Sequence, residues 1–411
     1  MEERIVRSNP PHFWRFDMPS DSVLPKRKLR FFTNPAGFDK MFFVALILVL
    51  VVGLVSLFSA SYAYSYYQNN GDSYAYITKQ IGYALVGVLF MFIISFVDYH
   101  VLHRWAIPIM IFSWALLLLV LFLPEIQNVH RWIRLGPINI QPSEIAKFAI
   151  ILLFAHWISH YKEQGMRQAS KGFWPFMLVL GFTAALVVVE PHLSGTMLII
   201  FIGMVMMFIG GTRPAPMVGV ILLGVAAVVL MVVVFGYEQD RFEVWNDPLK
   251  VYMSDKKYGN LTGRDVAWQT VQSLFAIGSG GLMGEGIGNS RQKHLFLPEP
   301  QNDFIFAIVC EELGFIGAVL IILLFGFLLW RGFAIGMKAP DKFGSMLAIG
   351  LTAQIGLQVA LNLAVVTNSM PNTGISLPFF SYGGSSLIML LMQMGLLLSI
   401  SRQGNYHAGK R

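Results

Sequence analysis

A series of long, uninterrupted apolar runs constrains this chain most strongly. The runs are roughly 18 to 25 residues long, which is the length that an α-helix needs to cross the hydrocarbon core of a bilayer. Hydrophobic residues make up 55% of the sequence and charged residues 13%, whereas a soluble domain carries about 25% charged residues. The alternating ~10-residue pattern of a transmembrane β-barrel is not seen. The sequence therefore predicts an all-α polytopic membrane protein.

We predict ten transmembrane helices, at residues 41–62, 80–97, 105–122, 143–160, 174–189, 194–210, 217–235, 304–330, 343–365 and 384–401. Lys and Arg are more frequent in the short loops on the same side of the membrane as the N-terminus, and the positive-inside rule assigns that side to the cytoplasm. Both termini are then cytoplasmic. Residues 1–40 form a basic tail without the apolar core of a signal peptide, and residues 403–411 form a short C-terminal tail.

The transmembrane domain is predicted to span residues 41–402. It includes a large outer loop, 236–302, between the seventh and eighth helices. The conspicuous polar loops all fall on the outer face, so a reaction centre is expected to face outward. Since Cys310 is the one cysteine, neither an intramolecular disulfide nor a cysteine metal cluster can form. In a membrane protein, the net charge of +7 relates to orientation in the bilayer and to contact with anionic lipids rather than to nucleic-acid binding.

An acidic residue lies where the large outer loop meets the eighth apolar run. Asp303 directly precedes Phe304, and further carboxylates lie close by at Glu299, Glu311 and Glu312. A carboxylate at the edge of a bilayer costs free energy unless a function or a partner compensates for it. Aspartate is also a favoured helix N-cap. The two roles are compatible, because a capping aspartate here would still face the outer aqueous surface.

Two arginines flank a tryptophan in the outer loop between the third and fourth runs, at Arg131, Trp132 and Arg134. The planar fork of arginine binds phosphate through two parallel hydrogen bonds. Tryptophan beside arginine is equally typical of an anchor at the lipid–water interface. Glu144 and Lys147 follow one turn apart just inside the fourth run, where we expect them to pair within the bundle.

Three segments are rich in helix-breaking residues. Glu190 and Pro191 form either a tight turn or part of a site. The glycines at 278–288 could bring backbone N–H groups to phosphate oxygens or form a flexible loop, and they match no nucleotide-binding motif. Residues 371–386 contain two prolines and three glycines. Such backbone occurs at membrane depth only where it is buried in protein or lines a cavity, so we expect this segment to be functional.

The order and spacing of these blocks resemble the SEDS family (shape, elongation, division and sporulation), represented by FtsW and RodA. The resemblance covers roughly residues 38–402 and is carried by Ser-Ala-Ser at 59–61, Arg-Trp-Ile at 131–133, Gln-Pro-Ser-Glu at 141–144, Gly-Glu-Gly at 284–286, Asp-Phe-Ile-Phe at 303–306, Glu-Glu-Leu-Gly at 311–314 and the segment 371–386. The stretch 190–196 departs from the shorter Asp-Leu-Gly-Thr-like block of many members, so no family role is transferred to His192.

The resemblance implies a ten-helix protein of the bacterial cytoplasmic membrane with an outward-facing glycosyltransferase site. Such a site polymerises lipid II into peptidoglycan strands. The implied partners are a class B penicillin-binding protein, other membrane proteins of the division or elongation complex, and membrane lipids. Asp303 matches the essential aspartate of the family and Trp132 its important tryptophan. The basic N-terminal tail and the Pro-Asn-Thr-Gly block at 371–374 resemble the division or sporulation branch more than the elongation branch.

From these residues we predict that Asp303 is the catalytic base, since glycosyl transfer needs a group that deprotonates the acceptor hydroxyl and cations that assist the leaving pyrophosphate. The predicted substrate-binding residues are Arg131, Trp132, Arg134, Glu144, Lys147, Arg241, Lys293, Glu299, Ser381, Gly383 and Ser385. A divalent cation, Mg²⁺ or Mn²⁺, could bridge the pyrophosphate, but such ions often need only one or two carboxylates. The sequence therefore does not identify a metal site.

Two other functions stay open. Intramembrane charges and Gly/Pro-broken helices also fit a transporter that moves lipid II between leaflets. A non-catalytic scaffold for a class B penicillin-binding protein would fit the membrane architecture as well. The enzyme is favoured because the polar motifs concentrate on one face, whereas a transporter needs access from both faces.

Overall fold

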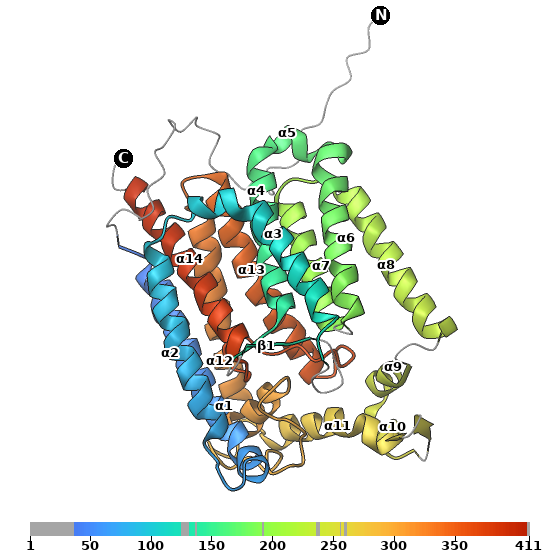
Figure 1. Cartoon of the computed structure of the whole chain (residues 1–411). Coiled ribbons are helices and arrows are strands. Elements are labelled where there is room, and N and C mark those ends of the chain that lie inside the picture. Colours follow the sequence, from blue (N-terminus) through green and yellow to red (C-terminus); the bar gives the residue numbers. More distant parts are fainter. Residues whose placement is uncertain are drawn as a thin grey trace, which may run out of the picture.

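The computed structural model describes residues 37–124, 131–135, 138–190, 193–235, 239–254, 256–258 and 261–408. Figure 1 shows the long helices packed side by side as one bundle. The helices that make up the bundle are α1 (Lys40–Gln68), α2 (Ala75–Phe96), α3 (His100–Val120), α4 (Pro142–His160), α6 (Trp174–Val189), α7 (Leu193–Ile209), α8 (Pro214–Phe235), α12 (Ile305–Met337), α13 (Lys342–Val366) and α14 (Gly384–Ala408).

Each of these helices overlaps one of the predicted spans, so the helical membrane fold is confirmed. Within the described residues, eight helices are long and apolar enough to cross a membrane, and two shorter apolar stretches occur at Leu193–Ile209 and Pro214–Gly224. The shorter stretches belong to α7 and α8. A count of ten crossings therefore stays a prediction.

The helices divide into central and peripheral ones. In α4 and α14, 72% of the most apolar 18-residue stretch is buried inside the protein, and in α13 this share is 67%. In α2, α3 and α12 the buried share is only 28%, 22% and 28%. The peripheral helices expose large apolar side chains such as Leu85, Phe112 and Leu323. Because an exposed apolar surface of this extent is unfavourable in water, these faces fit contact with lipid, and α4, α13 and α14 form the interior.

Local sequence signals set several helix starts. Asp39 caps α1 by accepting a hydrogen bond from the Phe42 amide, and Asp341 caps α13 in the same way through Gly344. In α4, Pro142 occupies the first turn together with Glu144, which suits the free N–H groups and positive dipole end found there.

The two ends of the described chain meet at one end of the bundle. Asn405 Nδ2 donates to the Gly37 carbonyl at 2.8 Å, and the Asp39 amide donates to Ser401 Oγ at 3.1 Å. Residues 1–36 of the predicted N-terminal tail lie outside the described residues, as do 409–411. The expected C-terminal tail from 403 is helical up to Ala408, where α14 ends, so the predicted boundary at 402 falls inside a helix.

The opposite end of the bundle carries the short elements of the predicted outer loop, whereas the five-residue helix α5 (Lys162–Met166) lies at the end where the termini meet (Figure 1). The predicted outer loop 236–302 contains secondary structure rather than a long irregular loop, because its own capping signals start helices. Thr262 and Asp265 form a reciprocal capping box at the start of α11, an arrangement that satisfies two otherwise free backbone donors. The remaining elements are α5 (Lys162–Met166), the π-helix η2 (Ala169–Phe173), α9 (Gln239–Asn246), α10 (Pro248–Tyr252), α11 (Gly263–Ser279), and the antiparallel pairs β1 (Ile133–Leu135) with β2 (Ile138–Ile140) and β3 (Lys257–Tyr258) with β4 (Leu261–Thr262).

The glycine-rich segment after α11 packs against a kink in α12. Gly314 has a φ of +66° inside α12, and a Cβ there would lie 2.3 Å from the Gly284 amide nitrogen. The backbone groups that the kink leaves free are paired with this segment, since the Glu285 and Gly286 amides donate to the carbonyls of Glu311 and Glu312 at 3.0 Å. The glycines therefore allow close backbone packing, and these amides do not face a phosphate site.

Candidate active site

A polar cavity of about 420 Å³ opens at the end of the bundle that carries α9 to α11. Its wall is built from α9, α11, the loop before β1, the start of α7, the junction before α12, and the segment that follows α13. The lining residues are Arg131, Leu193, Ser194, Asp240, Arg241, Val244, Trp245, Leu261, Val266, Gln269, Thr270, Asp303, Asn368, Asn372, Thr373 and Gly374. The structure thus brings together the predicted base, Asp303, and two of the predicted phosphate-binding arginines.

Asp303 lies in the turn that leads into α12, and its backbone is held from α13. Asn362 Nδ2 donates to the Asp303 carbonyl at 2.7 Å and to the Ile375 carbonyl at 2.6 Å. Asn362 therefore ties the junction before α12 to the segment after α13. Gly374 adopts a φ of +70°, and a Cβ on it would lie 3.1 Å from Asp303 Oδ2. The absence of a side chain at position 374 keeps the carboxylate accessible from the cavity.

The Asp303 carboxylate is electrostatically suited to act as a base. Among the residues that the structure describes, no donor is hydrogen-bonded to it. Loss of hydration raises the pKa of Asp303 to about 6, the charge of Glu299 acts in the same direction, and Arg131 opposes both. A general base is most effective when its pKa is near the operating pH. Asp303 is ionised at neutral pH and is more basic than an ordinary aspartate.

The two arginines come from distant parts of the sequence, Arg131 from the loop before β1 and Arg241 from α9. Arg131 Nε donates to the Glu190 carbonyl at 3.2 Å, and an Arg241 guanidinium nitrogen donates to the Asn372 carbonyl at 3.2 Å. Burial lowers the pKa of Arg131, which Glu190 and Asp303 partly offset, but arginine stays charged in proteins. Both guanidinium groups are thus held by backbone carbonyls beside the carboxylate.

Comparisons with known proteins identify the family of this chain. The family model described as Cell cycle protein, which covers FtsW, RodA and SpoVE, matches residues 39–406. The chain belongs to this family. Stage V sporulation protein E of Bacillus subtilis (strain 168) is 39% identical over 91% of this chain and 100% of its own length. The probable peptidoglycan glycosyltransferase FtsW of Geobacter sp. (strain M18) is 35% identical over 89% of this chain and 97% of its own length.

Solved structures show the same fold. A chain from a peptidoglycan synthase complex, studied for the coordination of polymerization and crosslinking, aligns with a TM-score of 0.71 at 27% identity over 89% of this chain and 98% of that chain. The rod shape determining protein RodA of Thermus thermophilus aligns with a TM-score of 0.64 at 27% identity over 90% of this chain and 98% of its own. The predicted family is confirmed.

Within this FtsW/RodA/SpoVE fold, the segment 371–386 divides into two parts. Asn372, Thr373 and Gly374 line the cavity. The three residues predicted from this segment, Ser381, Gly383 and Ser385, do not line it.

The second part of the segment instead holds the loop in shape. Ser381 Oγ accepts from the Leu377 amide and donates to the Asn302 carbonyl, both at 2.8 Å. The Gly383 amide donates to Gln80 Oε1 at 3.2 Å. Ser381 thus connects this loop to the junction before α12, and Gly383 connects it to α2, rather than facing the substrate as predicted.

The remaining residues of the loop before β1 differ in exposure. Trp132 is half-buried and directly precedes β1, and Arg134 is exposed within it. Neither side chain is part of the cavity wall. Glu299 is also outside that wall and accepts a hydrogen bond from Asn302 Nδ2 at 2.8 Å. Its influence on the site is electrostatic, through the raised pKa of Asp303. His130, Gly136, Pro191 and His192 lie outside the described residues.

Glu144 and Lys147 form the predicted ion pair inside the bundle. Lys147 Nζ lies 2.6 Å from Glu144 Oε1, and the two side chains are 4% and 9% exposed. They are therefore engaged with each other and do not line the cavity around Asp303. Their prediction as substrate-binding residues finds no support in this geometry.

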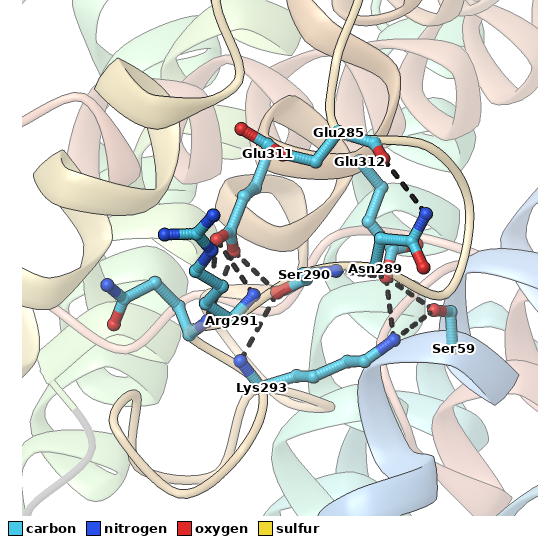
Figure 2. Close-up of polar contacts among 9 residues, drawn as sticks. Ser59, Glu285, Asn289, Ser290, Arg291, Lys293, Glu311 and Glu312 are labelled. Atoms are coloured by element: carbon cyan, nitrogen blue, oxygen red, sulfur yellow. Dashed lines mark hydrogen bonds and ion pairs between the residues drawn. The ribbon is translucent and has the colours of Figure 1, made fainter.

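Lys293 is also placed away from the cavity. Its ammonium group lies 2.9 Å from Glu312 Oε1 and 3.1 Å from Ser59 Oγ, in an interface between the loop after α11 and helices α1 and α12 (Figure 2). The side chains of Lys293 and Glu312 are 4% and 5% exposed. Lys293 was predicted to bind pyrophosphate, but burial and the ion pair commit its charge to holding the loop in place.

Glu311 completes this anchor on the other side of the same loop. Its Oε1 accepts from the Arg291 amide at 2.9 Å, and its Oε2 accepts from Ser290 Oγ (Figure 2). The Glu-Glu-Leu-Gly block of the sequence thus has a structural explanation. Two adjacent carboxylates at the start of α12 fasten the loop that leads to Asp303.

Several cavity residues were not predicted. Asp240, Trp245, Gln269 and Asn368 lie on α9, on α11 or just after α13. Asn368 Nδ2 donates to the Trp245 carbonyl at 3.0 Å, which connects α9 to the end of α13. The available signal was the polar face of two short amphipathic helices, which is also typical of an ordinary solvated surface.

Glu190 was noted in the sequence but was not assigned to the site. It is fully buried, and within the described part of the chain neither carboxylate oxygen has a hydrogen-bond partner. Burial raises the pKa of Glu190 to about 8, against the opposing influence of Arg131. At neutral pH Glu190 is therefore mostly protonated.

Proposed function

We propose that this chain is a peptidoglycan glycosyltransferase that polymerises lipid II during cell division or sporulation. The observation that carries the proposal is the convergence of Asp303, Arg131 and Arg241 on one polar cavity at the end of a membrane bundle. Membership of a family whose named relatives include peptidoglycan glycosyltransferases supports it. The identity of 39% to a stage V sporulation protein and of 35% to an FtsW protein favours the division or sporulation branch.

In the proposed reaction, Asp303 takes the proton from a hydroxyl group of the acceptor sugar. The hydroxyl oxygen forms a bond to the anomeric carbon of the donor, and the bond between that carbon and the pyrophosphate oxygen breaks. The leaving group is the lipid-linked pyrophosphate, which departs with the electron pair. The proton ends on Asp303 and passes to solvent before the next cycle.

Arg131 and Arg241 would stabilise the charge that develops on the pyrophosphate. Guanidinium groups provide paired donors to phosphate oxygens, and these two are oriented by backbone carbonyls before substrate arrives. Preorganised donors of this kind make the largest contribution to many enzymatic rate enhancements.

The cavity would face the outer side of the cytoplasmic membrane. The other end of the bundle carries Arg104 near the start of α3, Lys171 in η2, Arg213 before α8 and Lys338 after α12. The positive-inside rule supports a cytoplasmic position for that end. A cavity at the outer edge of the bilayer lets the sugar of a lipid-linked substrate reach Asp303 while its hydrocarbon tail stays in the membrane.

A divalent cation, Mg²⁺ or Mn²⁺, is compatible with the donors present. Within the described residues there is no group of three or more His, Cys, Asp or Glu side chains that could hold a metal. A cation bound mainly to pyrophosphate needs one or two carboxylates, and Asp240 on the cavity wall would supply one. Such an ion would neutralise charge on the leaving group.

A class B penicillin-binding protein is the proposed partner, which would crosslink the new strand. The support is the similarity to a chain that was solved within a peptidoglycan synthase complex. Other membrane proteins of the division machinery and surrounding lipids would complete the environment, and no nucleic-acid partner is proposed.

The test is strand synthesis from purified lipid II, with and without a co-purified class B penicillin-binding protein. Asp303→Asn removes the base, whereas Glu285→Gln removes an exposed carboxylate of the same loop outside the cavity wall. We expect polymer from wild type and from Glu285→Gln, and none from Asp303→Asn. Normal polymer from Asp303→Asn would refute the assignment. Movement of lipid II across liposome membranes without any polymer would instead indicate a transporter.

A further inference from the structure

A second polar cavity lies at the end of the bundle opposite to the Asp303 cavity. It has a volume of about 530 Å³ and forms where the start of α1 meets the ends of α12 and α14. Its charged lining residues are Asp39, Lys40, Arg331 and Lys338. Three cations thus face one carboxylate, which gives the cavity a net positive charge.

The single carboxylate is already engaged. Asp39 caps α1 through the Phe42 amide and also forms an ion pair with Arg331. Within the described residues, neither Lys40 nor Lys338 has an ion-pair partner. The Nε of Arg331 is buried and has no hydrogen-bond partner, and an unsatisfied buried donor costs free energy. The cavity therefore has two free ammonium groups and a free guanidinium donor, which an anion would satisfy.

A further cation adds to the positive field. Arg402 lies over the ring of Phe38, a lining residue, and over that of Phe96, and its Nε is also buried without a partner. No carboxylate is paired with Arg402 in the described part of the chain.

The surroundings of the cavity are apolar and exposed. Met41 at the cavity, and Met337 and Trp330 on α12, are 62%, 53% and 59% exposed. Tryptophan is enriched at the level of lipid headgroups, and Trp330 is followed by Arg331, whose guanidinium lies 5.6 Å from its ring centroid. Along the membrane surface α1 continues with the exposed side chains of Val44 and Leu48. A cationic cavity therefore borders a surface suited to acyl chains.

We propose that this cavity binds the phosphate headgroup of an anionic phospholipid. The phosphate oxygens would accept hydrogen bonds from Lys40, Lys338 and Arg331 Nε, and the acyl chains would lie along α1 and α12. Basic pockets between transmembrane helices on the cytoplasmic side recognise such headgroups. In the orientation proposed above, this end faces the cytoplasmic leaflet. The site is separate from the glycosyltransferase cavity, and its occupant would stabilise the junction of the first and last helices.

The test uses the purified full-length chain in mixed micelles with equal amounts of phosphatidylglycerol and phosphatidylcholine of the same acyl chains. Bound lipid is counted by native mass spectrometry. Lys40→Gln/Lys338→Gln removes the two free cations, and Lys171→Gln/Arg213→Gln removes two exposed cations that do not line the cavity. Because a lysine near an anionic lipid surface contributes on the order of 1 kcal/mol, we expect the first variant to lose about tenfold or more in preference for phosphatidylglycerol. The second variant should keep the wild-type preference.

Two further arms identify the occupant. Lys40→Arg/Lys338→Arg keeps both charges and should retain the preference, which excludes misfolding as the cause of the loss. Equal retention of phosphatidylglycerol by wild type and Lys40→Gln/Lys338→Gln would overturn the proposal. So would displacement of the bound lipid by inorganic phosphate, because the cavity would then be a site for the free anion.

Discussion

The buried ion pair between Lys293 and Glu312 gives a prediction that links the anchor of the loop to the position of Asp303. The pair joins the loop after α11 to the first part of α12, and both side chains are almost fully buried. Lys293→Met keeps most of the side-chain volume and removes the charge. Glu312 then stays buried without its cation, and the loop should open more often.

The expected size of the effect follows from the contacts that Glu312 keeps. Breaking a buried ion pair from one side costs about 3–5 kcal/mol. Glu312 still accepts from Ser59 Oγ at 2.6 Å and from the Ser290 amide at 3.4 Å. These bonds partly compensate the stranded charge, so we expect a loss near the lower limit, about 3 kcal/mol. Since 1.4 kcal/mol corresponds to a factor of ten, local opening should become roughly 100-fold more frequent.

Hydrogen exchange of residues 285–297 measures this opening directly. The Arg291 amide is protected by Glu311, the Lys293 amide by Ser290 Oγ, and the Leu297 amide by the Gln292 carbonyl. Their exchange should accelerate together in Lys293→Met.

The controls separate the stranded charge from the loss of a lysine as such. Lys257→Met removes an exposed lysine on β3 and should leave exchange unchanged. Lys293→Met/Glu312→Gln removes the stranded charge as well, and its exchange should return toward the wild-type rate, as expected for coupled neighbours. Wild-type exchange rates in Lys293→Met would show that the ion pair does not hold the loop, and the account of this anchor would be wrong.

Three further predictions concern the Asp303 cavity. Because the pKa of Asp303 is raised to about 6, the base is lost as the pH falls through that value. We expect kcat/KM for lipid II to decrease about tenfold per pH unit on the acid side, and a flat profile between about pH 5 and 8 would contradict the role of Asp303 as base. Gly374→Ala would place a Cβ 3.1 Å from Asp303 Oδ2 at a φ of +70°; we expect about 1–3 kcal/mol of strain and a lower kcat in the polymerisation assay, and an unchanged kcat would exclude the close approach. Arg241→Lys should lower kcat/KM about tenfold through loss of paired phosphate donors, whereas Arg264→Lys, on the exposed side of α11, should have no effect; equal values for the two variants would argue against Arg241 as a phosphate ligand.

Apolar runs predicted the fold well because membrane helices are specified by composition and length. The predicted span 174–189 coincides with α6, and the span 343–365 lies within one residue at each end of α13. Helix ends near polar loops were less predictable. Capping by Asp39 and Asp341 depends on a single side chain in each case. Helix α14 continues beyond its predicted end at 401 because polar residues at its last turns still pack within the protein, as Arg402 does over Phe38 and Phe96.

Charge alone could not distinguish a ligand-binding side chain from a structural one. Arg241 and Lys293 occur in the same predicted loop and were given the same role. The structure places Arg241 at the cavity and pairs Lys293 with Glu312. The difference depends on which carboxylate lies opposite each cation after folding, and the carboxylate opposite Lys293 comes from α12. Spacing within the loop contains no information about that contact.

Asp303 is held in position by two sets of contacts that do not involve its own carboxylate. Asn362 holds its backbone from α13, and the Ser59–Lys293–Glu312 contacts hold the preceding loop to α1 and α12. Strong hydrogen-bond donors to the Asp303 carboxylate would hold it in place, but they would also lower its pKa. Positioning through the backbone and through a distant ion pair avoids that conflict. The carboxylate is fixed in place without losing its basicity, and this is what a general base in a partly desolvated cavity requires.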